Sequence, residues 1–361
     1  MGSARVKSIA AVDVDRPHSV CPEVDPASPL QFVINAAAGS RDADTKREVI
    51  ETALQGAGRS GELRFCRPDA LASVAQEAAA KASAARTAVV AVGGDGTLNT
   101  VAQAAHAAGC AIGVVPQGTF NYFARTHGIP ADPAAAARQL LRASPMPVQV
   151  AAVNDRVFLV NASLGLYPDL LEDREAYKAR FGRSRWVAFW AASATLLRAQ
   201  RQLRLHIERG ASVRDVRALT LFVGNNRLQL EQLGVQPQVR RDGGHADALL
   251  DAPDDTYLTA VMLRPIGTLS MLRLMLHGAM GTLGEAQSVE GFEFKHMVVR
   301  PTLASGRRGV KVAYDGEVTR MRAPLVFRVL ARPLYLLMPR PDGTAINTGI
   351  DAAARAHGTR E

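Results

Sequence analysis

The chain has few cysteines. Only Cys21, Cys66 and Cys110 occur in 361 residues, and they are widely spaced. An odd number at such spacing predicts no disulfide framework. The sequence also lacks a CxxC pair and any Cys/His cluster with zinc-ligand spacing. These absences argue against a disulfide-rich secreted scaffold and against a small zinc module.

Long apolar runs are also missing. The first twenty residues lack the apolar core of about 7–15 residues that a secretory signal needs. Residues 96–124 contain no Asp, Glu, Lys or Arg, but glycine, proline, asparagine and glutamine interrupt them. A lipid-spanning helix would avoid such interruptions, so this stretch indicates a buried α/β core. We therefore expect a cytoplasmic protein without a transmembrane span.

The overall composition is that of a folded protein of two domains. A length of 361 residues fits two domains of about 100–200 residues each. Hydrophobic residues make up 47% and charged residues 21%, which excludes a wholly disordered chain. The net charge of +9 favours acidic partners such as nucleotides, nucleic acid or an anionic membrane. No nucleic-acid motif accompanies the charge, so we expect no nucleic-acid partner.

The first part of the chain alternates between strand and helix patterns. Residues 1–27 contain several prolines and indicate a flexible tail. Within residues 28–147, strands are expected at 30–34, 63–65, 88–92 and 112–115, and helices at 43–56, 69–85, 98–108, 121–126 and 133–143. This alternation predicts an α/β domain with a doubly wound parallel sheet.

The rhythm changes after residue 147. Within residues 148–332, short strands are expected at 148–153, 157–160, 203–208, 217–223, 258–263, 295–300, 309–314 and 325–330. Residues 174–201 and 267–281 have helical patterns. This pattern of many short strands and few helices predicts a β-rich, sandwich-like second domain. Residues 333–361 form a C-terminal segment that could pack back on the first domain.

The sequence Gly93-Gly94-Asp95-Gly96-Thr97 lies between an apolar strand and a helix. Its three glycines allow the backbone to approach an anion at a helix N-terminus, whose dipole favours phosphate. Asp95 would repel phosphate unless it meets a metal ion or a substrate hydroxyl. The motif is neither the dinucleotide GxGxxG nor the Walker sequence. A simple strand-to-helix turn is the alternative.

The glycine motif occurs together with Asn35, which follows the first strand, and with Gly118-Thr119-Phe120-Asn121 after a later strand. Together these residues resemble the diacylglycerol kinase catalytic family, which includes bacterial soluble lipid kinases, sphingosine kinases and ceramide kinases. The family shares the GGDGT turn with NAD kinases and 6-phosphofructokinases. The resemblance covers about residues 30–340 and implies an NAD kinase-like first domain.

The second half of the chain has further matches to the family. Residues 161–165 resemble its segment entering the second domain, and residues 221–226 resemble its VGN strand. Residues 247–251 resemble a DGxLD stretch, with Ala248 where glycine is usual. Asp315-Gly316-Glu317 resembles the late DGE motif. Without the upstream motifs, Asp315-Gly316 would simply indicate a hairpin turn.

The resemblance implies roles for particular residues. Gly93, Gly94, Gly96 and Thr97 would hold the phosphates of ATP; Asp95 would hold Mg²⁺ or polarise a lipid hydroxyl, and Glu317 would accept the proton of that hydroxyl. Around the nucleotide, the implied binding residues are Asn35, Asn99, Gly118, Thr119 and Asn121. A second Mg²⁺ site would include Asp247 and the Leu249 carbonyl, and the site would lie between the two domains.

One departure leaves the substrate open. Bacterial diacylglycerol kinases usually have an acidic residue where this chain has Tyr122, and sphingosine kinases also lack the acid. Tyr122 could equally be a core-facing helix residue. We expect an ATP- and Mg²⁺-dependent kinase of a diacylglycerol-like lipid, acting in phospholipid biosynthesis. The alternatives are a kinase of a soluble acceptor such as NAD and a non-catalytic nucleotide or lipid sensor.

A lipid kinase without a membrane span must dock on a bilayer. In the helical pattern at 174–201, basic residues lie beside aromatic ones, which suits an anionic surface: Arg180, Arg183, Arg185, Trp186, Phe189 and Trp190. The same spacing also fits a core-facing stripe. Residues 268–280 are a second candidate. We expect peripheral membrane association, and the sequence leaves formation of a homo-oligomer open.

Overall fold

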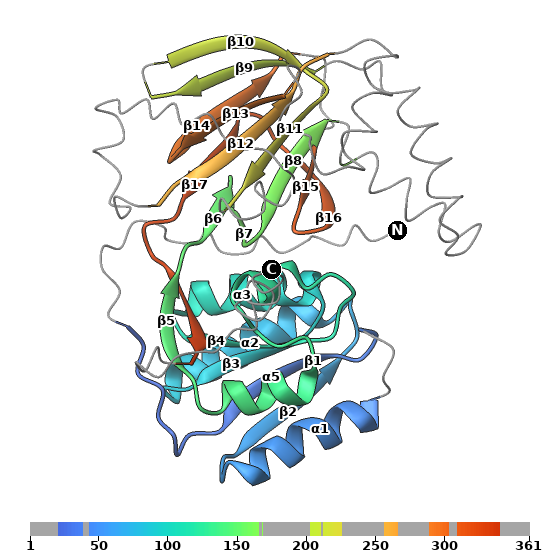
Figure 1. The fold of residues 1–361 in the computed structure, drawn as a ribbon, viewed down its shortest axis with the longest axis vertical. Helices are drawn as coiled ribbons and strands as arrows, with labels where there is room; N and C mark the ends of the chain where they lie inside the picture. Colours follow the sequence, from blue (N-terminus) through green and yellow to red (C-terminus); the bar gives the residue numbers. More distant parts are fainter. Residues whose placement is uncertain are drawn as a thin grey trace, which may run out of the picture.

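A computed structural model describes residues 21–38, 43–165, 168, 203–210, 212–225, 256–265, 289–302 and 309–339. The two helical patterns proposed for membrane docking fall outside these residues, as do Asp247, Leu249 and residues 1–20 of the expected tail. Figure 1 shows an α/β part and a β-rich part, with α3 (Asp95–Ala108) on the side of the first that faces the second.

The first domain is built on a six-stranded sheet in the order β2-β1-β3-β4-β18-β5. Four parallel strands form its centre and one edge: β1 (Leu30–Asn35), β2 (Gly61–Cys66), β3 (Ala88–Gly93) and β4 (Ala111–Pro116). Strand β18 (Leu334–Met338) returns from the end of the described chain to run parallel to β4. Strand β5 (Ser144–Val148) pairs with it in the antiparallel direction.

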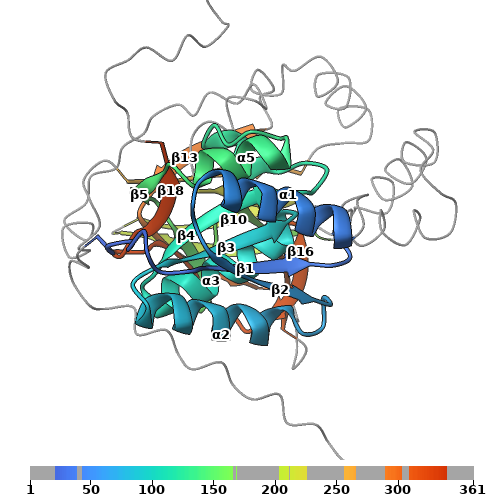
Figure 2. The same cartoon turned by 90° about the horizontal axis from the view of Figure 1, so that it is seen from below.

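Helices cover both faces of this sheet (Figure 2). Helices α1 (Ala43–Gly56) and α5 (Pro133–Leu140) share a core with Val90 and Val92. Helices α2 (Leu71–Ala84) and α3 (Asp95–Ala108) share another core with Val89 and Ala91. Adjacent residues of β3 thus face opposite layers, as the pleat requires. The structure confirms the predicted doubly wound α/β domain; a short helix, α4 (Tyr122–Thr126), follows β4.

The junction between the domains differs from the prediction. The strand expected at 148–153 is split, because Val148 ends β5 in the first sheet while β6 (Ala151–Val153) belongs to the second domain. Strand β5 was missed because it contains Pro145 and Pro147. Proline removes a backbone donor and is tolerated mainly in edge strands, and β5 lies at the edge of its sheet.

The described residues of the second domain form two six-stranded sheets, which confirms the predicted β-rich fold. One has the order β10-β9-β14-β17-β6-β7 and the other β13-β12-β11-β8-β15-β16. Apolar residues from both sheets form one core cluster, which indicates sandwich packing. The remaining strands are β7 (Arg156–Phe158), β8 (Asn161–Gly165), β9 (Leu203–Arg209), β10 (Ser212–Ala218), β11 (Thr220–Gly224), β12 (Leu258–Leu263), β13 (Val289–Phe294), β14 (His296–Pro301), β15 (Val310–Tyr314), β16 (Glu317–Met321) and β17 (Leu325–Val329).

The prediction of a single strand at 217–223 is wrong, because two strands share these residues. Strands β10 and β11 belong to different sheets, and Leu219 between them is buried. The chain crosses from one layer of the sandwich to the other within one residue. An apolar run without glycine or proline gives no sign of such a crossing, so the sequence pattern reads as continuous.

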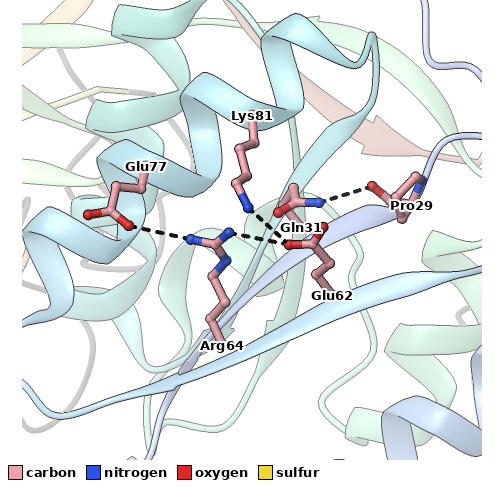
Figure 3. Close-up of polar contacts among 6 residues, drawn as sticks. All are labelled: Pro29, Gln31, Glu62, Arg64, Glu77 and Lys81. Atoms are coloured by element: carbon pink, nitrogen blue, oxygen red, sulfur yellow. Dashed lines mark hydrogen bonds and ion pairs between the residues drawn. The ribbon is translucent and has the colours of Figure 1, made fainter.

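Exposed charges hold the edge strand β2 against α2 (Figure 3). Glu62 accepts hydrogen bonds from Arg64 and Lys81, and Arg64 also pairs with Glu77. The hydrogen bond from Arg64 is the main cause of the lowered pKa of Glu62. Exposed ion pairs contribute at most about 1 kcal/mol each, so we assign this cluster a local structural role.

Within the part of the chain that the structure describes, no helix is both long enough and apolar enough to cross a bilayer.

Gly113 should be required for close packing of α5 on β4. A Cβ at this position would lie 2.4 Å from Leu140 Cδ1 and 3.2 Å from Val90 Cγ2. We expect Gly113→Ala to lower the free energy of unfolding by about 1–3 kcal/mol through overpacking. Gly56→Ala is a matched control, because a Cβ there meets nothing within 4 Å. Urea denaturation that shows equal stability for both variants would contradict this packing argument.

Candidate functional site

Two turns meet at the carboxyl ends of β3 and β4. The Gln117 N–H donates to the Gly93 carbonyl over 2.8 Å. A Cβ at Gly118 would lie 2.7 Å from Gly94 Cα, so the turns approach through their backbones. Carboxyl ends of parallel strands meet at one edge of a sheet, where ligands of open α/β folds bind. Glycine is required at Gly118 because any side chain would separate the turns.

The first turn leads into the N-terminus of α3. Gly94 is the N-cap residue, and the helix begins at Asp95. N–H groups of a first helical turn have no partner within the helix, and the helix dipole favours an anion there. Thr97 is buried beneath the turn, where its Oγ1 accepts a hydrogen bond of 3.0 Å from Asn35 Nδ2. Asn35 and Thr97 thus join the end of β1 to the first turn of α3.

The second turn is closed by Asn121. Its backbone is left-handed, with φ 48°, a conformation that asparagine tolerates better than most residues. The Asn121 Oδ1 accepts from the Gly118 N–H over 3.0 Å, and its Nδ2 donates to the Gly118 carbonyl over 2.8 Å. Both ends of the amide therefore hold the turn, and Thr119 is exposed at its tip. Asn121 shapes the site through these contacts.

Asp95 is half-buried between the two turns. Burial raises its pKa above the ordinary value, while backbone N–H groups of residues 121–123 act in the opposite direction. Its Oδ1 is buried without a hydrogen-bond partner in the described chain. An oxygen of this kind is available to a cation or to a substrate hydroxyl. No cluster of three or more His, Cys, Asp or Glu that could hold a metal occurs among the described residues.

Glu317 reaches this site from the second domain. It is the first residue of β16, directly after the two-residue turn at Asp315 and Gly316. A Cβ at Gly96 would lie 3.1 Å from Glu317 Oε1, so the carboxylate faces the first turn of α3. Part of the side chain is exposed, but loss of solvent raises the pKa of Glu317, and Arg156 opposes the rise. A carboxylate with a raised pKa beside an anion-binding turn can act as a general base.

Asp315 is buried and accepts four hydrogen bonds. Its Oδ1 accepts from the N–H groups of Val160 and Asn161, and its Oδ2 from the Leu159 N–H and Asn99 Nδ2. These distances are between 2.7 and 3.0 Å. Burial raises the pKa of Asp315 to about 6, against the effect of the four donors. The sequence motif identified Asp315 without showing this network.

The amide of Asn99, which we expected to contact the nucleotide, is hydrogen-bonded to the second domain. Asn99 is buried on α3, and its Nδ2 donates to the Val157 carbonyl over 3.0 Å and to Asp315 Oδ2 over 2.7 Å. Both partners lie in the second domain. Side-chain direction on a helix depends on its packing, so the motif alone could not show this orientation.

Sequence reasoning missed Lys46, which is 1% exposed on α1. Its Nζ donates to the carbonyls of Asn35 and Ala36 over 3.2 and 3.0 Å. A buried ammonium is costly unless it is hydrogen-bonded, so these bonds hold the end of β1 in place. Only six lysines occur in a chain rich in arginine, and a lysine close after the first strand is the one signal the sequence offered.

Comparison with known proteins identifies the family. The model of the diacylglycerol kinase catalytic domain matches residues 29–153. A "Probable lipid kinase YegS-like" of Pseudomonas aeruginosa is 34% identical over 239 residues, which cover 63% of this chain and 69% of that protein. A relative of the same name from Klebsiella pneumoniae is 39% identical over 98 residues, covering 26% of this chain and 33% of that protein.

Solved structures agree in fold. A diacylglycerol kinase from Bacillus anthracis superimposes with a TM-score of 0.58 at 16% identity, covering 87% of this chain and 98% of that one. A second structure from the same organism gives a TM-score of 0.63 at 18% identity, with the same coverage of both chains. These structures share the fold of the chain. The family model and the Pseudomonas relative show that the chain belongs to the diacylglycerol kinase catalytic-domain family of lipid kinases.

Proposed function

We propose that this protein is an ATP-dependent lipid kinase that transfers the γ-phosphate to a hydroxyl of a diacylglycerol-like lipid. The observation that carries the proposal is the approach of Glu317 to Gly96. It places a candidate base from one domain beside the anion-binding helix terminus of the other. Phosphoryl transfer needs mainly positioning, charge neutralisation and an oriented nucleophile. The helix terminus would favour the phosphate charge, and Glu317 would orient the hydroxyl.

Residues of the first domain would hold the nucleotide. Backbone N–H groups around Gly93, Gly94 and Gly96 would bind phosphate oxygens, while Thr97 and Asn35 keep the turn in shape. We propose Thr119, exposed at the tip of the second turn, as a further contact to the nucleotide. The Asn99 amide is occupied by the second domain, so we assign it a different role below.

Asp95 fits a Mg²⁺ ion. Mg²⁺ in kinases typically keeps several waters and uses one or two carboxylates together with substrate phosphates. The buried Asp95 Oδ1 has no hydrogen-bond partner in the described chain, so it is free to meet such an ion. When bound, Mg²⁺ would neutralise charge on the phosphates. The second Mg²⁺ site, at Asp247 and the Leu249 carbonyl, stays a prediction outside the described residues.

Glu317 would take the proton from the lipid hydroxyl as that oxygen attacks the γ-phosphorus of ATP. The bond from this phosphorus to the bridging oxygen would break, and ADP would leave. The raised pKa makes Glu317 more basic than an ordinary glutamate. The charge of Arg156 lowers the pKa of Glu317 and so opposes this rise. This role of Glu317 requires the second domain to hold the carboxylate beside Gly96 of the first domain.

An exposed aromatic pair favours an acceptor that lies in a bilayer. Phe120 and Tyr122 are 42% and 40% exposed in the second turn and α4. Their rings are stacked, with centroids 5.5 Å apart and planes 3° apart. Aromatic rings suit the interface between water and lipid. We propose that this pair contacts the membrane beside the site, in a cytoplasmic protein that associates peripherally with the bilayer.

The acceptor is tested by measuring ATP consumption with diacylglycerol, sphingosine, phosphatidylglycerol and NAD. Turnover with diacylglycerol and little with the others supports the proposal. Preferred turnover of NAD would establish the soluble-acceptor alternative, which the shared GGDGT turn keeps open. ATP binding without turnover of any acceptor would point to the nucleotide or lipid sensor instead.

Glu317→Gln should lower kcat by about 10²–10⁴-fold, because the amide cannot accept the hydroxyl proton. ATP affinity should stay within about twofold, since Glu317 lies on the second domain. Calorimetric titration of ATP and steady-state rates measure the two effects. The control is Glu77→Gln, an exposed residue on α2, which should keep normal turnover. Near-normal kcat in Glu317→Gln would remove Glu317 from the mechanism.

The rate should fall when acid protonates Glu317, at a pH above the ordinary 4.5 of a glutamate. Arg156 lowers the pKa of Glu317, so Arg156→Ala should raise this pKa and move the acid limb of kcat to higher pH. Arg320→Ala, on the same strand as Glu317, should leave the limb in place. A limb that does not move in Arg156→Ala would mean that another group, such as Asp315, controls the rate.

The variant Phe120→Ser with Tyr122→Ser should separate membrane contact from catalysis. We expect KM to rise about tenfold for diacylglycerol in vesicles, because exposed apolar area is lost. With a short-chain, soluble diacylglycerol the rate should stay within about threefold of that of the original protein. Equal losses with both acceptors would show that the pair acts on the turn itself and would reject a membrane role.

A further inference from the structure

We infer that Asp315 is a positioning residue that sets Glu317 against α3 by joining the turn of the second domain to Asn99. This inference rests on the proposed function, because it concerns the group that would accept the proton. In the Asp315-Gly316-Glu317 motif, Asp315 would therefore position the base and would not itself take part in the reaction. Contacts among α3, β7, β8 and the turn between β15 and β16 support the inference.

The carboxylate of Asp315 is where these elements converge. Three consecutive backbone N–H groups donate to it, those of Leu159 and Val160 after β7 and of Asn161 at the start of β8. The fourth donor, Asn99 Nδ2, comes from the first domain. Asn99 Nδ2 also donates to the carbonyl of Val157 in β7, so one amide joins α3 to two places in the second domain.

One face of α3 carries the contacts between the domains. Gly96, Asn99, Gln103 and His106 are spaced three, four and three residues apart, so they lie on one side of the helix. Gly96 faces Glu317, and Gln103 Oε1 accepts from the Val157 N–H over 3.3 Å. His106 Nε2 lies 3.0 Å from the Arg332 carbonyl. The helix whose first turn would hold phosphate is therefore also the surface on which the second domain rests.

Asp315 is linked to Glu317 by a short, constrained turn. Asp315 and Gly316 have φ values of 44° and 87°, and the flanking Tyr314 and Glu317 pair directly in the ladder between β15 and β16. The turn thus has only two residues, so fixing the position of Asp315 leaves Glu317 little freedom to move. If the carboxylate moved, Glu317 would move away from Gly96.

The surroundings of Asp315 require an acceptor. An ionised carboxylate accepts with both oxygens, whereas an asparagine would turn its NH₂ group toward N–H donors. Such a contact leaves buried donors unpaired, which is costly. Asp315→Asn should therefore loosen the turn while adding no bulk.

The first experiment is a double-mutant cycle with Asp315→Asn and Glu317→Gln. Alone, Asp315→Asn should lower kcat by about 10²-fold, as expected for misplacement of a base, and leave ATP affinity within about twofold. In the Glu317→Gln background, the same change should lower kcat less than about twofold, because the residue it positions is gone. Losses that multiply fully would overturn the inference.

Asn99→Leu gives a second variant if Asp315→Asn folds poorly. It removes one donor and keeps the three backbone donors, and we expect a smaller loss of kcat that also disappears in the Glu317→Gln background. Gln103→Leu is the matched control on the same face of α3, since it removes a contact to the Val157 N–H without touching Asp315. A loss in Gln103→Leu equal to that in Asn99→Leu would show general loosening of the domains and reject the specific role.

Amide hydrogen exchange tests the contact without any activity. In Asp315→Asn, the N–H groups of Leu159, Val160 and Asn161 should exchange faster than in the original protein, and in Gln103→Leu these three should not change. Unchanged exchange in Asp315→Asn would overturn the inference. If no acceptor is turned over, the proposed function fails, and the exchange rates still decide whether Asp315 holds this junction.

Discussion

Helix α3 has to meet two demands, and the rest of the structure depends on both. In the proposed function its N-terminus has to stay open to an anion, and in the structure one of its faces carries the second domain. The first demand is met by glycines at Gly94 and Gly96, and the second by Asn99, Gln103 and His106 on the same helix. The glycines and the domain contacts lie on one helix, so this helix fixes the position of the β-rich domain relative to the candidate phosphate site. Glu317 can then approach Gly96 although the two residues are more than two hundred positions apart.

The electrostatics of the site differ from what the net charge of +9 suggests. Asp95, Asp315 and Glu317 lie in or beside the site, and burial raises the pKa of each. Lys46 is committed to two carbonyl groups at the end of β1. Phosphate would therefore be held mainly by backbone N–H groups and by a cation at Asp95. This arrangement explains why the motif is built from glycine and aspartate, with few basic residues.

Much of the first domain could be predicted because its strands are apolar runs separated by helices of high alanine content. Buried parallel strands give this signal directly. The sandwich was recognisable as β-rich, but its strand boundaries were less so. The division between β10 and β11 falls inside an apolar segment, and β5 contains two prolines. In both places, pairing with strands distant in sequence overrides the local pattern.

The candidate site divides in the same way. The sequence by itself determined the glycine turns, the Asp315-Gly316-Glu317 motif and the family, since special backbone conformations and short polar motifs are local properties. Only the tertiary structure decided that Asn99 faces Asp315, that Gly94 touches Gly118 and that Lys46 is buried under Asn35. These are relations between residues far apart in the chain. They arise when the sheet and the sandwich pack against α3, which no local pattern of side chains records.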